Sequence, residues 1–458
     1  MESCDPELAA VSAERVDAVI AAVGRHDEAL ARRMRVAADG LTKDEGEECI
    51  TQAGLQQYLW YDLAQRSPAQ LWRPVAEAAA VLLSLLGLDR YAAIARSATT
   101  ARVLGAWDEA PGKGFTAFQA ANSASGVEPP DTGLLAWGEV FGLEEALARG
   151  AVEAALEEAI VAGRLRPGRG SWRKVAAAIC DEVLMALVGD RGATRAASVL
   201  GERADTWVAR GRPASLRDWR ESARAAMDLL EPVSVDTDDA AVSTAPMRWL
   251  LERCREGVPL TKAGYLPPAL VQEAAERFGW WPFEGRPRSE ADVHQLGVLR
   301  DTARRLHLLG PRARRLTTSR RGLLVAEDPA ALFRDVSTTL ACENEYLAML
   351  SEIVAHRLLA GPAVAQSLEQ AVGPVITAQG WMTGGDLVSE QRAGWAAHRA
   401  LYHWRLFGLL DEKRPPREDW QHADLSVTAL TPAGRAAALT FLRARAISPG
   451  RRSDFGRG

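Results

Sequence analysis

Helical periodicity dominates the first half of the sequence and constrains the fold more than any other feature. Apolar residues recur at intervals of three and four, a spacing that puts them on one face of a helix, as in Trp72, Val75, Ala79, Leu82, Leu83 and Leu86. Strong helix formers fill the positions between them, and Gly- and Pro-rich stretches interrupt the pattern. We therefore predict a helical-array domain over 45–231, preceded by a loose N-terminal helix and loop over 1–44.

The segment EPVSVDTDDAAVSTAP, from residue 231 to 246, breaks this pattern. It contains two prolines, three aspartates and many small residues without helical or strand periodicity. Such a composition is typical of a connection between domains. We predict an acidic linker over 232–246.

The sequence beyond the linker has a different order of elements. A short helix, MRWLLERC, is followed by a brief extended piece and a second helix, PPALVQEAAERFG. A third helix, ADVHQLGVLRDTARRLHLLG, leads into LLGPRARRLTT, which predicts a hairpin with a Gly-Pro turn. Helix, strand, helix, helix and hairpin is the order of a winged helix. We predict a winged-helix-like module over 247–328, called module 1.

A partial second copy follows. GWMTGGDL echoes PLTKAGYL, and RAGWAAHRALYHWRLFGLLD echoes the third helix of module 1. Leu430-Thr431 matches Leu316-Thr317, and Arg435 matches Arg321, but the copy has no clear second helix. We predict connecting helices and a winged-helix-like module 2 over 329–446, then a disordered tail over 447–458. The predicted fold class is mainly α: a helical-array domain followed by two winged-helix-like modules, each α with a small β-hairpin.

These segments carry a family resemblance. LTKAGYLPPALV, LRDTARRLHLLG and LTPAGR resemble the winged-helix-like region of uncharacterised proteins from high-GC Gram-positive bacteria, as found beside plasmid-type open-reading-frame-three domains. The segment from LQQYLWYDL to SGVEPPDTGLLAWG resembles their N-terminal part. The resemblance implies the fold and no activity.

Arginine clusters in one place. The stretch from Arg300 to Gly322 holds eight arginines and one acid, although the net charge of the chain is −5. If module 1 is a winged helix, its third helix and hairpin present these charges on adjoining surfaces, where such a fold meets phosphates and a groove. The candidate nucleic-acid-binding residues are Arg300, Arg304, Arg305, Arg312, Arg314, Arg315 and Arg321. We expect a DNA-binding, regulatory role.

Two alternatives stay open. The arginines could form a protein interface or a plain solvated surface, because arginine is abundant throughout this sequence. Module 2 has no net charge between Arg405 and Arg435, and its aromatic residues favour its own core or a partner surface, with Trp395, Tyr402, Trp404 and Trp420 as candidates for exposure. A homodimer or a protein partner, bound through the helical domain or module 2, is therefore also expected.

Enzymatic chemistry has no local signature in the sequence. His398 and His403 are five residues apart and do not share a helix face, and HExxH, CxxC and GxSxG motifs are absent from the sequence. We expect no catalytic residues, no cofactor and no metal, and the runner-up is an enzyme whose site is assembled from distant residues. The acidic, polar N-terminus and the short apolar runs predict a cytoplasmic protein that does not bind membranes.

Overall fold

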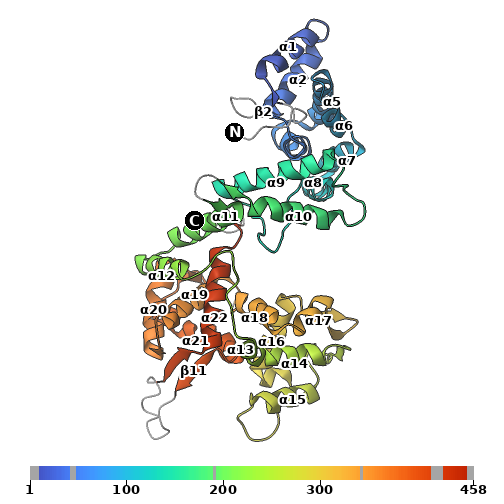
Figure 1. Ribbon diagram of the computed structural model, residues 1–458. Helices are drawn as coiled ribbons and strands as arrows, with labels where there is room; N and C mark the ends of the chain where they lie inside the picture. The colour runs from blue at the N-terminus through green and yellow to red at the C-terminus, as the bar shows by residue number, and fades with distance from the viewer. Residues whose placement is uncertain (1–9, 42–47, 189–191, 341–343, 414–425, 451–458) are drawn as a thin grey trace. The chain divides into compact units, whose positions relative to one another are not determined.

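The computed structural model describes residues 10–41, 48–188, 192–340, 344–413 and 426–450 (Figure 1). Helices make up 66% of the structure and strands 7%, so the prediction of a mainly α fold is confirmed. The chain divides into two compact units, 1–199 with 449–458 and 200–448, which are described separately. The linker predicted over 232–246 therefore lies inside the second unit.

The first unit is a set of packed helices with two short antiparallel strand pairs. Its elements are β1 (Ala10–Val11), α1 (Ala13–Gly24), α2 (Glu28–Leu41), β2 (Glu48–Cys49), α3 (Gln52–Gln57), the π-helix η1 (Tyr58–Asp62), α4 (Leu63–Arg66), α5 (Ala69–Leu85), α6 (Asp89–Ala95), α7 (Ala98–Glu109), α8 (Pro111–Ser125), α9 (Leu143–Val161), α10 (Trp172–Met185), β3 (Leu187–Val188) and β4 (Ala193–Thr194). Helix α11 (Arg195–Ala209) contains the boundary between the units.

The N-terminal helices belong to the core of the first unit. Val16 and Ile20 of α1 and Met34 of α2 are buried in the same apolar cluster as α5, because each helix has an apolar face that only packing can cover. The loose N-terminal helix predicted from the sequence is thus packed against its neighbours. At the other end of the chain, the Glu139 N–H donates to the Gly450 carbonyl over 2.7 Å, so part of the predicted disordered tail is held. Residues 451–458 lie outside the described residues.

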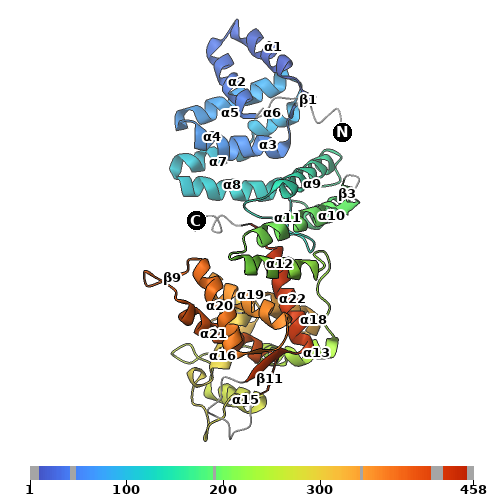
Figure 2. The ribbon, with the colours of Figure 1, turned by 90° about the vertical axis from the view of Figure 1, so that its left-hand side faces the viewer.

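The second unit carries the remaining elements. They are α12 (Ala214–Ala225), α13 (Thr237–Ser243), α14 (Ala245–Arg253), β5 (Val258–Pro259), α15 (Pro268–Phe278), the 3-10 helix η2 (Glu290–Asp292), α16 (His294–Arg305), β6 (Leu309–Arg312), β7 (Arg315–Thr318), α17 (Arg320–Ala326), α18 (Pro329–Thr338), α19 (Glu345–Leu359), β8 (Ala363–Val364), α20 (Ala365–Ala378), β9 (Met382–Thr383), β10 (Asp386–Leu387), α21 (Glu390–Leu406), β11 (Leu410–Lys413), β12 (Val427–Leu430) and α22 (Pro432–Ala446). Figure 2 gives a second view of both units.

The predicted acidic linker contains helix α13. The Asp236 side chain accepts hydrogen bonds from the N–H groups of Asp238 and Asp239 and so caps this helix. Acidic residues in a first turn also interact favourably with the helix dipole. Ala240 is fully buried in the core of the second unit. The aspartates that suggested a linker instead start a short helix that packs against α18 and α22.

Two parts of the second unit repeat one topology. In module 1 the order is α14, β5, α15, α16, β6 and β7, and its sheet has the order β5-β7-β6. In module 2 the order is α19, β8, α20, α21, β11 and β12, and its sheet has the order β8-β12-β11. In both antiparallel sheets the last strand pairs with the first strand and with its hairpin partner.

The repeat extends to the residues that follow each hairpin. Ser319 in module 1 and Thr431 in module 2 cap the next helix, accepting from the N–H groups of Gly322 (2.9 Å) and Gly434 (3.0 Å). A Cβ on Gly322 would clash with the Leu308 carbonyl oxygen, and one on Gly434 would clash with the equivalent carbonyl of the other module. The structure therefore pairs Thr431 with Ser319, and the sequence match of Thr431 to Thr317 was wrong by two positions.

The second helix of module 2, which the sequence comparison did not find, is α20. GWMTGGDL does not correspond to PLTKAGYL, because it forms the extra hairpin β9–β10 between the second and third helices. The strand equivalent to β5 is β8, which precedes α20 directly. The inserted hairpin displaced the sequence match from its true position.

One apolar cluster joins the two modules, and module 2 has a second cluster of its own among α19, α20 and α21. Leu299 of α16, Trp404 of α21 and Phe441 of α22 are fully buried in the same apolar cluster. Helices α16 and α21 are in contact, and the rings of His294 and Tyr402 meet edge to face at 5.3 Å. The third helix of each module therefore faces the other module and not solvent along part of its length. In the part of the chain that the structure describes, no helix has the length and apolarity needed to span a membrane.

Buried histidines make the stability of the second unit depend on pH. Burial lowers the pKa of His356 to about 4, with Glu352 acting in the opposite direction. Burial and the charge of Arg305 lower the pKa of His403 to about 4. Between pH 6.5 and about 4 the unfolded chain therefore binds protons that the folded chain does not bind.

We expect the free energy of unfolding to fall as the pH drops below about 6.5, by roughly 1.4 kcal/mol per pH unit for each ring. His356→Gln and His403→Gln should each remove the contribution of one histidine to this dependence of the free energy of unfolding on pH. Urea unfolding of wild type and variants between about pH 7 and 5.5 measures the slope, since few carboxyl groups titrate there. An unchanged slope in both variants would contradict the assignment.

Candidate nucleic-acid interface

The hairpin of module 1 ends in a two-residue turn of unusual backbone conformation. Arg312 pairs with Arg315 across the strands, and the intervening Ala313 and Arg314 have φ values of 47° and 64°. Two-residue hairpin turns of this kind favour Asn-Gly, and a left-handed conformation costs other residues about 1–2 kcal/mol each. The turn thus holds Arg314 at the tip of the hairpin in a conformation that arginine rarely adopts.

The predicted Gly-Pro turn of this hairpin was wrong. Gly310 and Pro311 lie within β6, opposite Thr317 and Leu316 of β7. Because β6 is an edge strand of the sheet, a proline there leaves no inner hydrogen bond unmade. The turn therefore falls two residues later, on the alanine and the arginine.

A second turn lies beside the tip of the hairpin. The Leu260 N–H donates to the Arg314 carbonyl over 3.0 Å, and the Thr261 N–H donates to the Tyr265 carbonyl over 2.9 Å. These bonds close a tight turn that leaves Lys262 exposed. The sequence did not indicate that Lys262 lies beside the hairpin tip because it is 52 positions before Arg314, a separation that only the pairing of β5 with β7 closes.

Three of the seven predicted arginines are held by their own unit. The Arg300 guanidinium binds Glu290, the Arg315 guanidinium donates to the Gly257 carbonyl, and Arg321 binds Asp335 at 2.7 Å. Arg321 remains half exposed, but Arg300 is mostly buried. The guanidinium groups of these three arginines are engaged within the second unit, so a ligand would have to compete with their internal partners.

The other four predicted arginines differ in exposure. Arg305 is half-buried, donates to the Thr302 hydroxyl over 3.3 Å and lies near the buried ring of His403. Arg304, Arg312 and Arg314 are exposed, and their side chains make no hydrogen bond or ion pair with any residue in the described ranges. Together with Lys262 they form a set of free cations at the end of α16 and at the hairpin tip, which we call the wing surface (Lys262, Arg304, Arg312 and Arg314).

The pair of Glu290 and Arg300 fixes the position of the wing surface. A Glu290 carboxylate oxygen accepts from Arg300 at 2.8 Å and from the Leu266 N–H at 2.9 Å. Arg300 also donates to the Gly264 carbonyl over 3.0 Å. Burial raises the pKa of Glu290, although the Leu266 N–H and Arg300 act against this. The pair ties α16 to the turn that carries Lys262.

The third helix of module 1 has little left to present to a ligand. Its exposed residues are His294, Asp301 and Arg304, and His294 is in contact with Tyr402 of module 2. One free cation and one acid on a helix are a poor set for reading base edges, which needs several convergent donors and acceptors. The wing surface is accordingly suited to phosphates.

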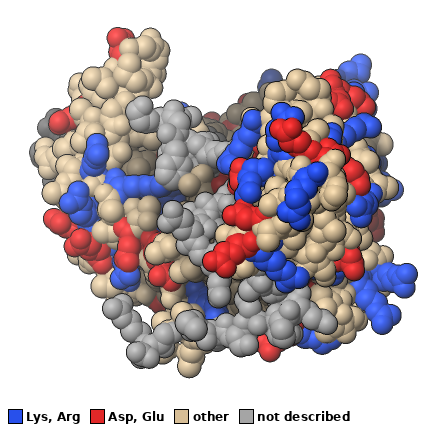
Figure 3. All heavy atoms as spheres, turned by 90° about the horizontal axis from the view of Figure 1, so that it is seen from above, with Lys and Arg blue, Asp and Glu red and all other residues tan. Residues whose placement is uncertain are grey.

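Charge elsewhere on the molecule is mixed. On the face shown in Figure 3, basic and acidic side chains are interspersed.

In module 2, Trp404 is fully buried while Trp395 and Tyr402 are 61% and 45% exposed, so the aromatic residues divide between core and surface. Trp420 lies outside the described residues.

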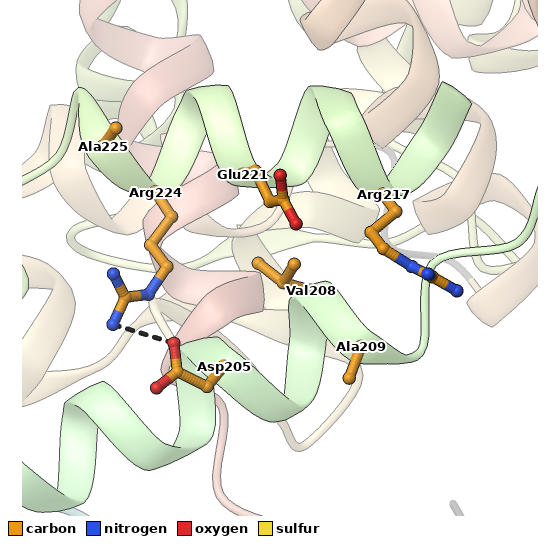
Figure 4. Close-up of a pocket in the computed structure, with 7 residues that line it drawn as sticks. All are labelled: Asp205, Val208, Ala209, Arg217, Glu221, Arg224 and Ala225. Atoms are coloured by element: carbon orange, nitrogen blue, oxygen red, sulfur yellow. Dashed lines mark ion pairs between the residues drawn. The ribbon is translucent and has the colours of Figure 1, made fainter. Parts of the chain in front are cut away.

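The second unit also has a shallow pocket between α11 and α12 (Figure 4). Asp205 and Arg224 on its wall form an ion pair at 2.8 Å, and Glu221 and Arg217 line the rest. The charges largely neutralise one another, and among the described residues no nucleophile with a neighbouring base lines the pocket. No cluster of His, Cys, Asp or Glu in the described ranges could hold a metal ion.

Arginines with different contacts should respond differently to truncation. Arg300→Ala leaves Glu290 buried without its cation, so we expect the free energy of unfolding to fall by about 3 kcal/mol. Arg304→Ala, one helical turn further on and exposed, should change it by less than about 0.5 kcal/mol. Urea unfolding of the two variants measures the difference, and equal effects would contradict the described pairing.

The chain was compared with models of protein families, with curated proteins and with solved structures, and none of the three comparisons gave a match.

Proposed function

We propose that this protein binds nucleic acid, with duplex DNA as the expected ligand and a regulatory role, and that module 1 makes the contact. The order of helices and strands in module 1, with β5 pairing beside the hairpin, supports its assignment as a winged helix. The same order in α19–β12 supports the assignment of module 2. Winged helices place the hairpin tip against the phosphate backbone. Arg312 and Arg314 of the wing surface lie at that tip, Lys262 lies on the turn beside it, and Arg304 lies at the end of α16.

The observation that carries the proposal is the turn at Ala313-Arg314. Two adjacent non-glycine residues with positive φ store strain, and no ion pair or hydrogen bond of the Arg314 side chain with a described residue offsets it. Strain without internal compensation points to a ligand that uses the side chain. The proposed ligand is a phosphate, for which the three free guanidinium groups and the Lys262 ammonium of the neighbouring turn are suited.

The mode of binding follows from the packing of α16. Since this helix is partly covered by α21 and its Arg300 is held by Glu290, the free cations meet the backbone and not the bases. Such binding depends steeply on salt and weakly on sequence.

A protein partner is the second candidate, favoured by one observation. Met382 and Leu387 are cross-strand neighbours on the β9–β10 hairpin and are 57% and 64% exposed. Paired exposed apolar side chains on a projecting hairpin are typical of a contact surface.

The first test is a salt titration of the full-length chain on a labelled random-sequence duplex, followed by fluorescence anisotropy. Wild type should bind with a steep dependence on salt. Arg304→Ala/Arg312→Ala/Arg314→Ala should reduce the slope of log K against log salt by about 0.9 for each phosphate interaction removed, up to about 3. A matched removal of three exposed cations from the first unit, Arg25→Ala/Arg66→Ala/Lys174→Ala, controls for net charge. Equal effects of the two variants, or no binding at low salt, would overturn the proposal.

The turn offers a test that separates stability from binding. Ala313→Asn/Arg314→Gly installs the preferred turn sequence and should raise the free energy of unfolding by roughly 1 kcal/mol, while weakening duplex binding because the Arg314 cation is removed. Ala313→Asn alone should stabilise and leave binding unchanged. The free energy of unfolding and the duplex affinity are measured on the same preparations. If the double variant binds the duplex as tightly as wild type, Arg314 does not contact the duplex.

A further inference from the structure

The outward face of α21 carries a second arrangement that the wing surface does not include. Arg392, Trp395 and Arg399 are exposed and follow one another at intervals of three and four, so they lie on one face of the helix. The opposite face is buried in the core of the second unit through Ala393, Ala397, Ala400, Leu401 and Trp404. A packed helix therefore fixes the backbone from which the three side chains project.

Trp395 is the most exposed tryptophan in the described ranges. Its side chain is 61% exposed, and it makes no aromatic contact with a described residue, whereas every other described tryptophan is buried or half-buried. Exposing an indole forgoes the burial of a large apolar surface. A flat ring presented in this way is suited to a planar ligand.

Two free cations flank the ring. The side chains of Arg392 and Arg399 make no ion pair or hydrogen bond with any residue that the structure describes, and Glu390, at the first position of α21, is the only acid on this helix. Seven residues of helix separate the arginines by about 10 Å along the axis. Both lie near Tyr346. Burial raises the pKa of this tyrosine, although the two arginine charges act against the rise. The face thus alternates cation, ring and cation.

We propose that this face of α21 binds single-stranded nucleic acid, with a base stacked on Trp395 and phosphates on Arg392 and Arg399. Single-strand binding sites combine aromatic platforms with cations that follow the backbone. A duplex does not satisfy the arrangement, because its bases are already stacked on both faces. A protein contact centred on tryptophan has a surround of apolar residues, whereas the neighbours of Trp395 on this face are the arginines, Gln391 and His398.

The test uses the full-length chain and two fluorescein-labelled oligonucleotides of equal length, an oligothymidine and a strand with the same phosphates but abasic sites. Wild type should bind the oligothymidine more tightly than the abasic strand, because only the oligothymidine can stack. Trp395→Leu keeps an apolar side chain without a flat ring and should weaken oligothymidine binding about tenfold, leaving the abasic strand unaffected. Arg392→Ala/Arg399→Ala should weaken both strands.

The outcomes separate this proposal from that for the wing surface. Trp395→Leu should leave duplex binding unchanged, and Arg304→Ala/Arg312→Ala/Arg314→Ala should preserve the preference for the oligothymidine. Equal binding of the two strands by wild type, or an unchanged oligothymidine affinity in Trp395→Leu, would overturn the α21 proposal whatever the duplex result. Binding of poly-glutamate in place of the oligothymidine, abolished in Trp395→Leu, would also overturn it and assign the face to an acidic protein. Thermal melting checks that each variant is folded. The melting temperature should match that of wild type, because the replaced side chains are exposed.

Discussion

A buried carboxylate, Glu352, holds together the helices that support both modules. It lies on α19 with no exposure to solvent, 2.6 Å from the Arg220 guanidinium of α12 and 3.2 Å from that of Arg445 on α22. Burial alone would raise the pKa of Glu352, but the two arginines outweigh it and hold that pKa below its usual value. Removing either cation would leave a buried charge undercompensated, which is among the costliest single changes in a protein. One turn further along α19, the ring of His356 stacks against Trp207 and Trp219.

This arrangement explains why the candidate interfaces lie at the margins of the modules. With α19 and α22 fixed, one apolar cluster joins the two modules and α16 packs against α21. The helix faces that a solitary module would expose are then partly covered. In the two modules as described, the free cations named above lie at the hairpin tip and its neighbouring turn, at the end of α16 and on the outward face of α21.

The sequence predicted the helices of module 1 and the presence of its hairpin, since both depend on local periodicity, but it placed the turn two residues too early. It could not separate the free arginines from the held ones. Arg300 and Arg304 are neighbours on one helix, and only the tertiary contact with Glu290 makes the first structural and leaves the second exposed. The inserted β9–β10 hairpin concealed α20, because a repeat is hard to align across an insertion. Helix α13 was missed for a different reason, because the acidic and irregular composition around its cap, Asp236, resembled a linker.

The glycines after the two hairpins have a consequence for how these modules tolerate change. Each hairpin leaves its third helix through a left-handed residue, His307 or Gly408, and returns to a capped helix whose glycine lies against a backbone carbonyl. Both ends of the loop are therefore anchored by main-chain geometry that is independent of the residues between them. Residues can therefore be inserted at the hairpin tip, or their charges changed, without altering the positions where the hairpin joins the two helices.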